Sequence, residues 1–263
     1  MLKFSANLTM LFNEVDFLTR FKHASEAGFR GVEYLFPYQW DKEQLLEQLE
    51  TYNLKQVLHN LPAGDWQAGE RGIACLPGRE SEFQEGVGLA IEYAKKLRCP
   101  CLNCLVGITP SETPPEKVHK TLVANLRFAA DALEKAKIRL LIEPLNSQDM
   151  PGFHLTKTRD AIKLIEEIGH ANIWLQYDIY HMQIMEGNLI RSIQDNLPRI
   201  AHMQIADNPG RHEPGTGEIN YPNLFRFIDN TTYDGWIGCE YKPAGKTEDG
   251  LAWAKEYLKQ GGE

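Results

Sequence analysis

Residues 139–179 read RLLIEPLNSQDMPGFHLTKTRDAIKLIEEIGHANIWLQYDI, with two short apolar runs on either side of an amphipathic segment. The runs 139–145 and 173–179 are typical of buried strands, and the apolar residues of 158–169 recur at helical spacing. This order predicts a strand–helix–strand unit in which the helix connects two parallel strands. Each predicted strand also carries a carboxylate near its end, Glu143 in the first and Asp178 in the second.

The same alternation extends over the whole chain. Eight strand-like runs occur at 3–8, 31–36, 55–60, 101–106, 139–145, 173–179, 200–206 and 236–241. Helical patterns lie at 17–28, 42–53, 82–98, 116–137, 158–169, 188–197, 223–230 and 248–260. Eight strand–helix repeats in 263 residues predict a single (β/α)8 TIM barrel that spans residues 1–263. A doubly wound open sheet is the alternative, but no G-x-G-x-x-G motif follows the first strand.

The composition of the chain limits the kinds of partner and the cellular compartment that we expect for the protein. The chain has 28 Lys plus Arg and 36 Asp plus Glu, and its net charge of −8 disfavours nucleic acid as a ligand. No apolar run approaches the roughly 18 residues needed to span a membrane, and the N-terminus is too acidic for a signal peptide. We therefore expect a cytoplasmic protein. Cys99, Cys101 and Cys104 lie in a strand-like run, which favours reduced thiols over a zinc site.

Four polar side chains end the last four predicted strands. They are Glu143, Asp178, Gln204 and Glu240, each separated from the next by about one strand–helix unit. If these strands are neighbours in a barrel, three carboxylates and one amide oxygen meet at one rim. Ligands that are all oxygen suit a hard divalent cation, Mg²⁺ or alternatively Mn²⁺.

Other residues on the same predicted face are candidates for binding a substrate. His181, three residues after Asp178, is a candidate metal ligand or hydrogen-bond donor, and His59 is a candidate contact to a substrate hydroxyl or carboxylate. A structural role for His59 in the turn before Pro62 is the alternative. Arg71 and Lys242 are candidate partners of a substrate carboxylate. The long loops 61–79 and 207–221 follow strand ends, where walls or lids of a barrel site are expected.

Several motifs resemble those of the hydroxypyruvate isomerase family, within the xylose isomerase-like barrels. They are H-N-L-P-A-G-D at 59–65, Q-Y-D-I-Y-H at 176–181, H-M-Q-I-A-D at 202–207, R-H-E-P-G-T-G-E-I-N-Y at 211–221 and G-W-I-G-C-E-Y-K-P at 235–243. The resemblance covers essentially the whole chain. Among its branches, the 2-oxo-tetronate isomerases are the most similar in overall sequence.

This resemblance implies a metal bound by Glu143, Asp178, Gln204 and Glu240, with Glu143 and Glu240 as proton donor and acceptor. It implies an isomerase that interconverts the 2-oxo and 3-oxo forms of a small sugar acid through a cis-enediolate. The substrate would be hydroxypyruvate or a 2-oxo-tetronate. The resemblance leaves open whether the protein forms a homo-oligomer.

Three other functions fit the same predicted scaffold. One is an inosose dehydratase-like lyase, and another is a sugar-acid binding protein without catalysis, against which the four-ligand set argues. The third is a metal-dependent DNA repair enzyme of the endonuclease IV type. That class carries a histidine ligand where this chain has Gln204, and an Asp-x-His motif where this chain reads Gly210-Arg211-His212. The acidic net charge also argues against it.

Overall fold

Eight parallel strands pair in chain order and close into a barrel, with the last strand returning to the first. The structure is a computed structural model that describes residues 1–258. The strands are β1 (Lys3–Asn7), β2 (Gly31–Glu33), β3 (Lys55–Asn60), β4 (Cys101–Cys104), β5 (Arg139–Ile142), β6 (Ile173–Asp178), β7 (Ile200–Ile205) and β8 (Trp236–Cys239). The predicted TIM-barrel architecture is confirmed.

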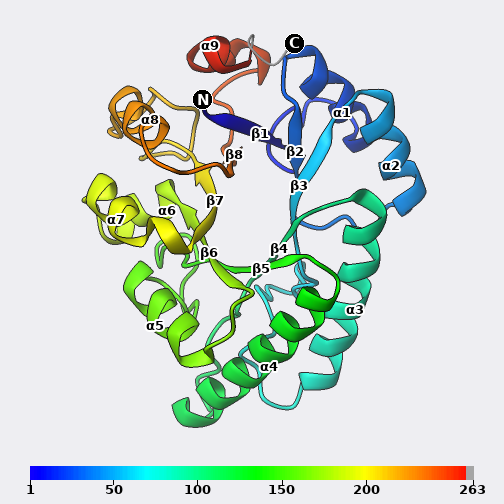
Figure 1. Cartoon of the computed structure of the whole chain (residues 1–263), viewed down its shortest axis with the longest axis vertical. Coiled ribbons are helices and arrows are strands. Elements are labelled where there is room, and N and C mark those ends of the chain that lie inside the picture. Colours follow the sequence, from blue (N-terminus) through cyan, green and yellow to red (C-terminus); the bar gives the residue numbers. More distant parts are fainter. Residues whose placement is uncertain (259–263) are drawn as a thin grey trace.

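Helices surround the barrel as an outer ring (Figure 1). They are α1 (Phe17–Glu26), α2 (Lys42–Thr51), α3 (Glu80–Leu97), α4 (Pro115–Lys135), α5 (Thr158–Ile168), α6 (Ile179–Met185), α7 (Leu189–Asn196), α8 (Tyr221–Asp229) and α9 (Lys255–Leu258). Two short 3₁₀ helices, η1 (Leu197–Arg199) and η2 (Glu248–Ala254), complete the described chain. Within that range, no helix is both long and apolar enough to cross a membrane.

The stretch 139–179 forms the predicted strand–helix–strand unit as β5, α5 and β6. Residues Ala161, Leu164, Ile165 and Ile168 form the buried stripe of α5, as their helical spacing predicts. The helix ends at Gly169, whose φ of +66° is a left-handed conformation that glycine adopts without a steric penalty.

The connection between β6 and β7 contains one more helix than predicted. Besides α7, which matches the predicted segment 188–197, the chain forms α6 directly after Asp178. Asp178 caps this helix, because its Oδ1 accepts a hydrogen bond from the Tyr180 amide at 2.8 Å. The metal-ligand candidate therefore also starts a helix.

The predicted helix 248–260 differs from the structure as well. Its described part is η2 followed by the single turn of α9, and residues 259 and 260 lie outside the described range. All five cysteines are buried and unpaired, and Cys101 and Cys104 bound β4, as predicted for strand residues.

The barrel interior changes from apolar to polar along the strands. Near the strand starts, Val57, Cys101 and Leu141 form a small buried cluster against Trp174 and Trp236. Toward the carboxyl ends, buried polar side chains replace them, among them Asn7, Glu33, Asn103, Gln176 and Gln204. Packed apolar side chains therefore fill the barrel near the strand starts, and hydrogen-bonding and charged groups lie near the carboxyl ends.

Candidate active site

The four predicted metal ligands lie at the carboxyl ends of four consecutive strands. Glu143 follows β5, Asp178 ends β6, Gln204 lies in β7 and Glu240 follows β8. Asp178 and Gln204 are register partners in the sheet, and all four side chains are buried. Figure 1 shows β5 to β8 side by side along one part of the barrel. The barrel therefore brings together residues that span almost 100 positions of sequence.

The donor atoms of this site fit a divalent cation. Single ligand atoms of Glu143, Asp178 and His181 lie within 4.8 Å of one another. Asp178 Oδ2 is buried and has no hydrogen-bond partner among residues 1–258. Gln204 Oε1 accepts one hydrogen bond, from Gln176 Nε2 at 2.6 Å, and keeps a second lone pair. A buried carboxylate oxygen without a donor is costly unless a cation satisfies it.

His181 presents a hydrogen-bond donor to the site. Its Nδ1 lies 3.2 Å from the Asn146 backbone nitrogen and 2.7 Å from Asn146 Nδ2, both of which are donors. Asn146 Oδ1 accepts from the Gln148 and Asp149 amides, and this fixes the orientation of its side chain. Burial lowers the pKa of His181 well below its ordinary value, so the ring is neutral. Since Nδ1 accepts, the ring proton lies on Nε2, 3.7 Å from Asp178 Oδ2.

Burial and mutual repulsion raise the pKa of each carboxyl group in the site. Burial, and then the charges of Glu240 and Asp178, raise the pKa of Glu143 well above its ordinary value. Burial is also the main cause for Asp178, whose pKa is raised. The pKa of Glu240 is raised to about 8 by burial and by the neighbouring carboxylates, against the opposing effect of Arg211. Three adjacent buried carboxylates cannot all ionise at neutral pH without more positive charge nearby.

Arg211 is the cation that contacts this cluster. Its Nη2 lies 2.6 Å from Glu240 Oε1 and 3.7 Å from Asp178 Oδ2, and its guanidinium lies over the Tyr180 ring. The Tyr180 hydroxyl in turn donates to Asp149 at 2.9 Å. Sequence reasoning did not select Arg211, although the residue opens the motif at 211–221 in the long loop after β7. Its φ of +58° is unusual for a residue other than glycine, and nothing in the sequence indicates this conformation.

The two basic residues predicted from the sequence, Arg71 and Lys242, lie in their loops away from the buried carboxylates. Arg71 stacks on Trp66, 4.0 Å from the ring centroid, and donates to the backbone oxygens of Trp66 and Glu70. Lys242 is exposed, and its backbone amide donates to the Arg211 carbonyl oxygen at 2.7 Å. Neither side chain forms an ion pair with the buried carboxylates of the site, whereas Arg211 lies close to two of them, Asp178 and Glu240.

His59 does not reach the carboxylates either. Its Nδ1 lies 2.9 Å from Gln56 Nε2, and its ring packs edge-on against Tyr38. The next residue, Asn60, points to the opposite face of β3, where its Oδ1 accepts from Asn103 Nδ2 at 3.2 Å. Asn103 Nδ2 also donates to Glu143 Oε2 at 2.9 Å. Asparagines therefore line the mouth where a histidine was expected.

A match to a protein-family model covers residues 21–257, and the model describes a xylose isomerase-like TIM barrel. The hydroxypyruvate isomerase of Escherichia coli is 59% identical over 98% of this chain and 100% of its own length. This chain belongs to the hydroxypyruvate isomerase family of xylose isomerase-like barrels. The family predicted from the motifs is confirmed, and the protein is an isomerase.

Other family members are similar over the same length. The 2-oxo-tetronate isomerase of Cupriavidus necator is 45% identical over 97% of this chain and 98% of the relative. A solved structure described as an AP endonuclease of family 2 from Brucella melitensis has a TM-score of 0.96 and 47% identity, covering 98% of this chain and 99% of that one. The 3-keto-D-glucoside 4-epimerase of E. coli, at 21% identity and a TM-score of 0.79, shows the shared fold.

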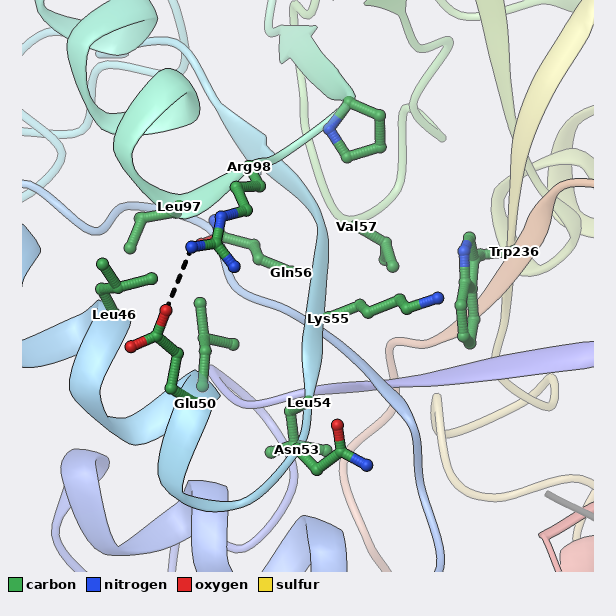
Figure 2. A pocket seen from close by; sticks show the side chains of 12 residues that line it. Leu46, Glu50, Asn53, Leu54, Lys55, Gln56, Val57, Leu97, Arg98 and Trp236 are labelled. Atoms are coloured by element: carbon green, nitrogen blue, oxygen red, sulfur yellow. Dashed lines mark hydrogen bonds and ion pairs between the residues drawn. The ribbon is translucent and has the colours of Figure 1, made fainter. Parts of the chain in front are cut away.

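This hydroxypyruvate isomerase family member has a second hollow at the other end of its barrel. This groove has a volume of about 520 Å³ and lies beside the start of β3. Figure 2 shows Lys55 extending toward Trp236 along it. Its arginine, Arg98, is paired with Glu50 at 3.1 Å. Because the buried carboxylates lie at the strand carboxyl ends, the chemistry belongs to that end of the barrel.

The location of His59 predicts how acid destabilises the protein. Burial lowers the pKa of His59 to about 3, below the ordinary value of 6.5 that the unfolded chain should show. The unfolded state therefore binds the extra proton, and stability from the neutral ring is lost as pH falls from 6.5 toward 3. When the pH falls from 7.5 to 5.5, the free energy of unfolding should decrease in both proteins. We expect this decrease to be about 1.4 kcal/mol smaller in His59→Asn than in the unmodified protein.

Urea unfolding of both proteins at the two pH values measures this difference. Other titrating groups are common to both proteins and cancel in the comparison. If the two proteins lose the same unfolding free energy, His59 is not held neutral by burial.

Proposed function

We propose that this protein moves a carbonyl group between C2 and C3 of a small sugar acid. The two isomers would be hydroxypyruvate and tartronate semialdehyde, or the corresponding forms of a 2-oxo-tetronate. The observation that supports this most is the pair of buried glutamates, Glu143 and Glu240, which share one barrel mouth with Asp178 and Arg211. The greater identity to the E. coli hydroxypyruvate isomerase than to the C. necator 2-oxo-tetronate isomerase makes hydroxypyruvate the first substrate to test.

Glu143, Asp178, Gln204 and Glu240 would hold a divalent cation, Mg²⁺ or alternatively Mn²⁺. The bound cation would polarise the substrate carbonyl and stabilise the negative charge that develops on the substrate oxygens. The unpartnered Asp178 Oδ2 and the free lone pair of Gln204 Oε1 support this assignment.

The two glutamates would carry the proton. One carboxylate would remove the proton on one carbon to give a cis-enediolate, and the other glutamic acid would return a proton to the neighbouring carbon. The hydroxyl proton would pass from one substrate oxygen to the other, so that the carbonyl and the hydroxyl exchange places. Burial raises the pKa of both residues, whereas a bound cation would lower it, so the two effects oppose each other at these carboxyl groups. Asn103 and Asn7 donate hydrogen bonds at 2.9 Å to Glu143 and Glu240 respectively, and so fix the two carboxyl groups.

Arg211 and His181 would bind the substrate oxygens. Arg211 Nε is buried and has no hydrogen-bond partner in the described chain, so a donor remains for a substrate carboxylate. The His181 Nε2 proton supplies a neutral donor to a substrate oxygen. We leave out His59 and Arg71, whose side chains contact Gln56 and Trp66, and Lys242, whose side chain is exposed.

Glu143→Gln and Glu240→Gln should each lower kcat by at least about a hundredfold, since an amide cannot exchange the proton. Proton NMR in D₂O, which follows deuterium entering hydroxypyruvate, measures the reaction directly. Glu166→Gln, an exposed glutamate of α5, is the control and should leave the rate unchanged. Near-normal exchange in both site variants would refute the acid–base assignment.

Removal of metal by a chelator should lower activity at least tenfold, and added Mg²⁺ or Mn²⁺ should restore it. Binding of Mn²⁺ to the metal-free protein, counted by electron paramagnetic resonance, should give one site per chain. Asp178→Asn should weaken that site, because it replaces a charged ligand by a neutral one. Full activity in protein shown to be free of metal would exclude the cation from the reaction.

Arg211→Gln should raise KM for the carboxylate substrate about 10- to 100-fold, which corresponds to the loss of a charge-assisted hydrogen bond of about 1.5–3 kcal/mol. Lys242→Gln removes an exposed cation near the same loop and should change KM less than twofold. Steady-state kinetics with hydroxypyruvate make the comparison. The opposite result would assign the substrate carboxylate to Lys242.

The alternatives predict different products. A lyase would release water, which the NMR assay detects as a new unsaturated or dehydrated product. The 47% identity to the B. melitensis structure makes DNA cleavage worth a direct test with a duplex that contains an abasic site. The net charge of −8 and the glutamine at position 204 argue against that activity.

A further inference from the structure

Glu33, the last residue of β2, is a buried carboxylate with no role in the proposed reaction. Four polar side chains surround it, three of which donate hydrogen bonds. Ser5 Oγ donates to Oε2 at 2.8 Å, and His202 Nε2 lies 2.9 Å from the same oxygen. Gln204 Nε2 donates to Oε1 at 2.8 Å and Asn7 Nδ2 at 3.3 Å. Oε2 therefore contacts Ser5 and His202, whereas Oε1 contacts Gln204 and Asn7, the two side chains on the active-site side.

The two donors on Oε1 also contact Glu240. Asn7 Nδ2 donates to Glu240 Oε2 at 2.9 Å, and Gln204 Nε2 donates to the same atom at 2.6 Å. Each amide nitrogen is thus shared by Glu33 and Glu240. A carboxylate can only accept, so both amides must turn their nitrogens toward Glu33. The oxygen of Gln204 then faces away from Glu33, on the side of Gln176, where a cation is expected.

We infer that Glu33 is a positioning residue for the metal centre: its Oε1 holds the amides of Gln204 and Asn7 so that the Gln204 oxygen faces the cation and Glu240 stays in place. The inference rests on the proposed function. Glu33 touches neither substrate nor metal and acts through two residues that do. Without it, Gln204 keeps Gln176 and Glu240 as partners but loses one of the two carboxylate acceptors that hold its nitrogen and so keep its oxygen toward the metal.

A structural role for Glu33, as the partner of His202, predicts something different. In that case any loss of metal binding would follow the loss of stability. Ser5→Ala separates the two, because it removes one hydrogen bond from Oε2 and leaves the contacts of Oε1 intact. Val57→Ala, in the apolar end of the barrel, provides a destabilised control far from the metal site.

Mn²⁺ titration of each metal-free variant, followed by electron paramagnetic resonance, is the experiment, with thermal unfolding and kcat measured in parallel. We expect Glu33→Met to raise the Mn²⁺ Kd at least tenfold and to lower kcat. Ser5→Ala and Val57→Ala should keep the Kd within twofold of the unmodified protein despite a lower Tm. Glu33→Gln should restore most of the affinity, because its amide oxygen can take the place of Oε1.

Glu33→Met with unchanged Mn²⁺ affinity, or a Glu33→Gln variant no better than Glu33→Met, would overturn the inference. If Glu33→Met does not fold, Glu33→Asp replaces it, since its carboxylate is drawn back by one methylene. Its affinity should then be at least fivefold weaker than that of Ser5→Ala, and equal affinity would overturn the inference. An unmodified protein that binds no Mn²⁺ would instead refute the proposed metal centre itself.

Discussion

The burial of several like charges at one end of the barrel is the constraint on which the rest of the site depends. Glu143, Asp178 and Glu240 are each less than a tenth exposed, and burial raises the pKa of all three. Ionised together, they would be strongly destabilising without partners. Arg211 supplies one positive charge, and asparagine and glutamine donors satisfy part of the oxygens. A divalent cation would supply the remaining charge, which is why a metal and a set of amide side chains belong to the same site.

The barrel interior also provides the space that these polar groups need. Apolar side chains fill the interior near the strand starts, so the polar groups collect in one layer above them. Gly238 in β8 leaves room for the Glu33 carboxylate, since a Cβ at that position would lie 2.2 Å from Oε1. A side chain at position 238 would therefore displace the acceptor that holds Gln204 and Asn7. Packing in the interior and the geometry of the proposed metal site are coupled at this glycine.

Sequence periodicity was enough to predict the barrel and the position of four polar side chains at the ends of consecutive strands, because the sequence changes from apolar to polar where a buried parallel strand ends. It could not predict which face His59 and Asn60 occupy, since a one-residue shift reverses both. Arg211 depends on the path of a 15-residue loop, for which no periodic signal exists. Glu33 resembled an ordinary residue at the end of a short strand, and its donors come from β1 and β7, far away in the sequence.

The proposed site would contact the two candidate substrate classes in the same way. Hydroxypyruvate and a 2-oxo-tetronate share the carboxylate and the two carbons between which the carbonyl moves. The strand-end residues and Arg211 would contact only those shared atoms, so they would not distinguish the two substrates. The additional carbon of the tetronate must be recognised beyond that set, by side chains at the barrel mouth. The loops 61–79 and 207–221 follow strand carboxyl ends there, and differences in these loops, rather than in the metal ligands, should therefore decide the length of the substrate.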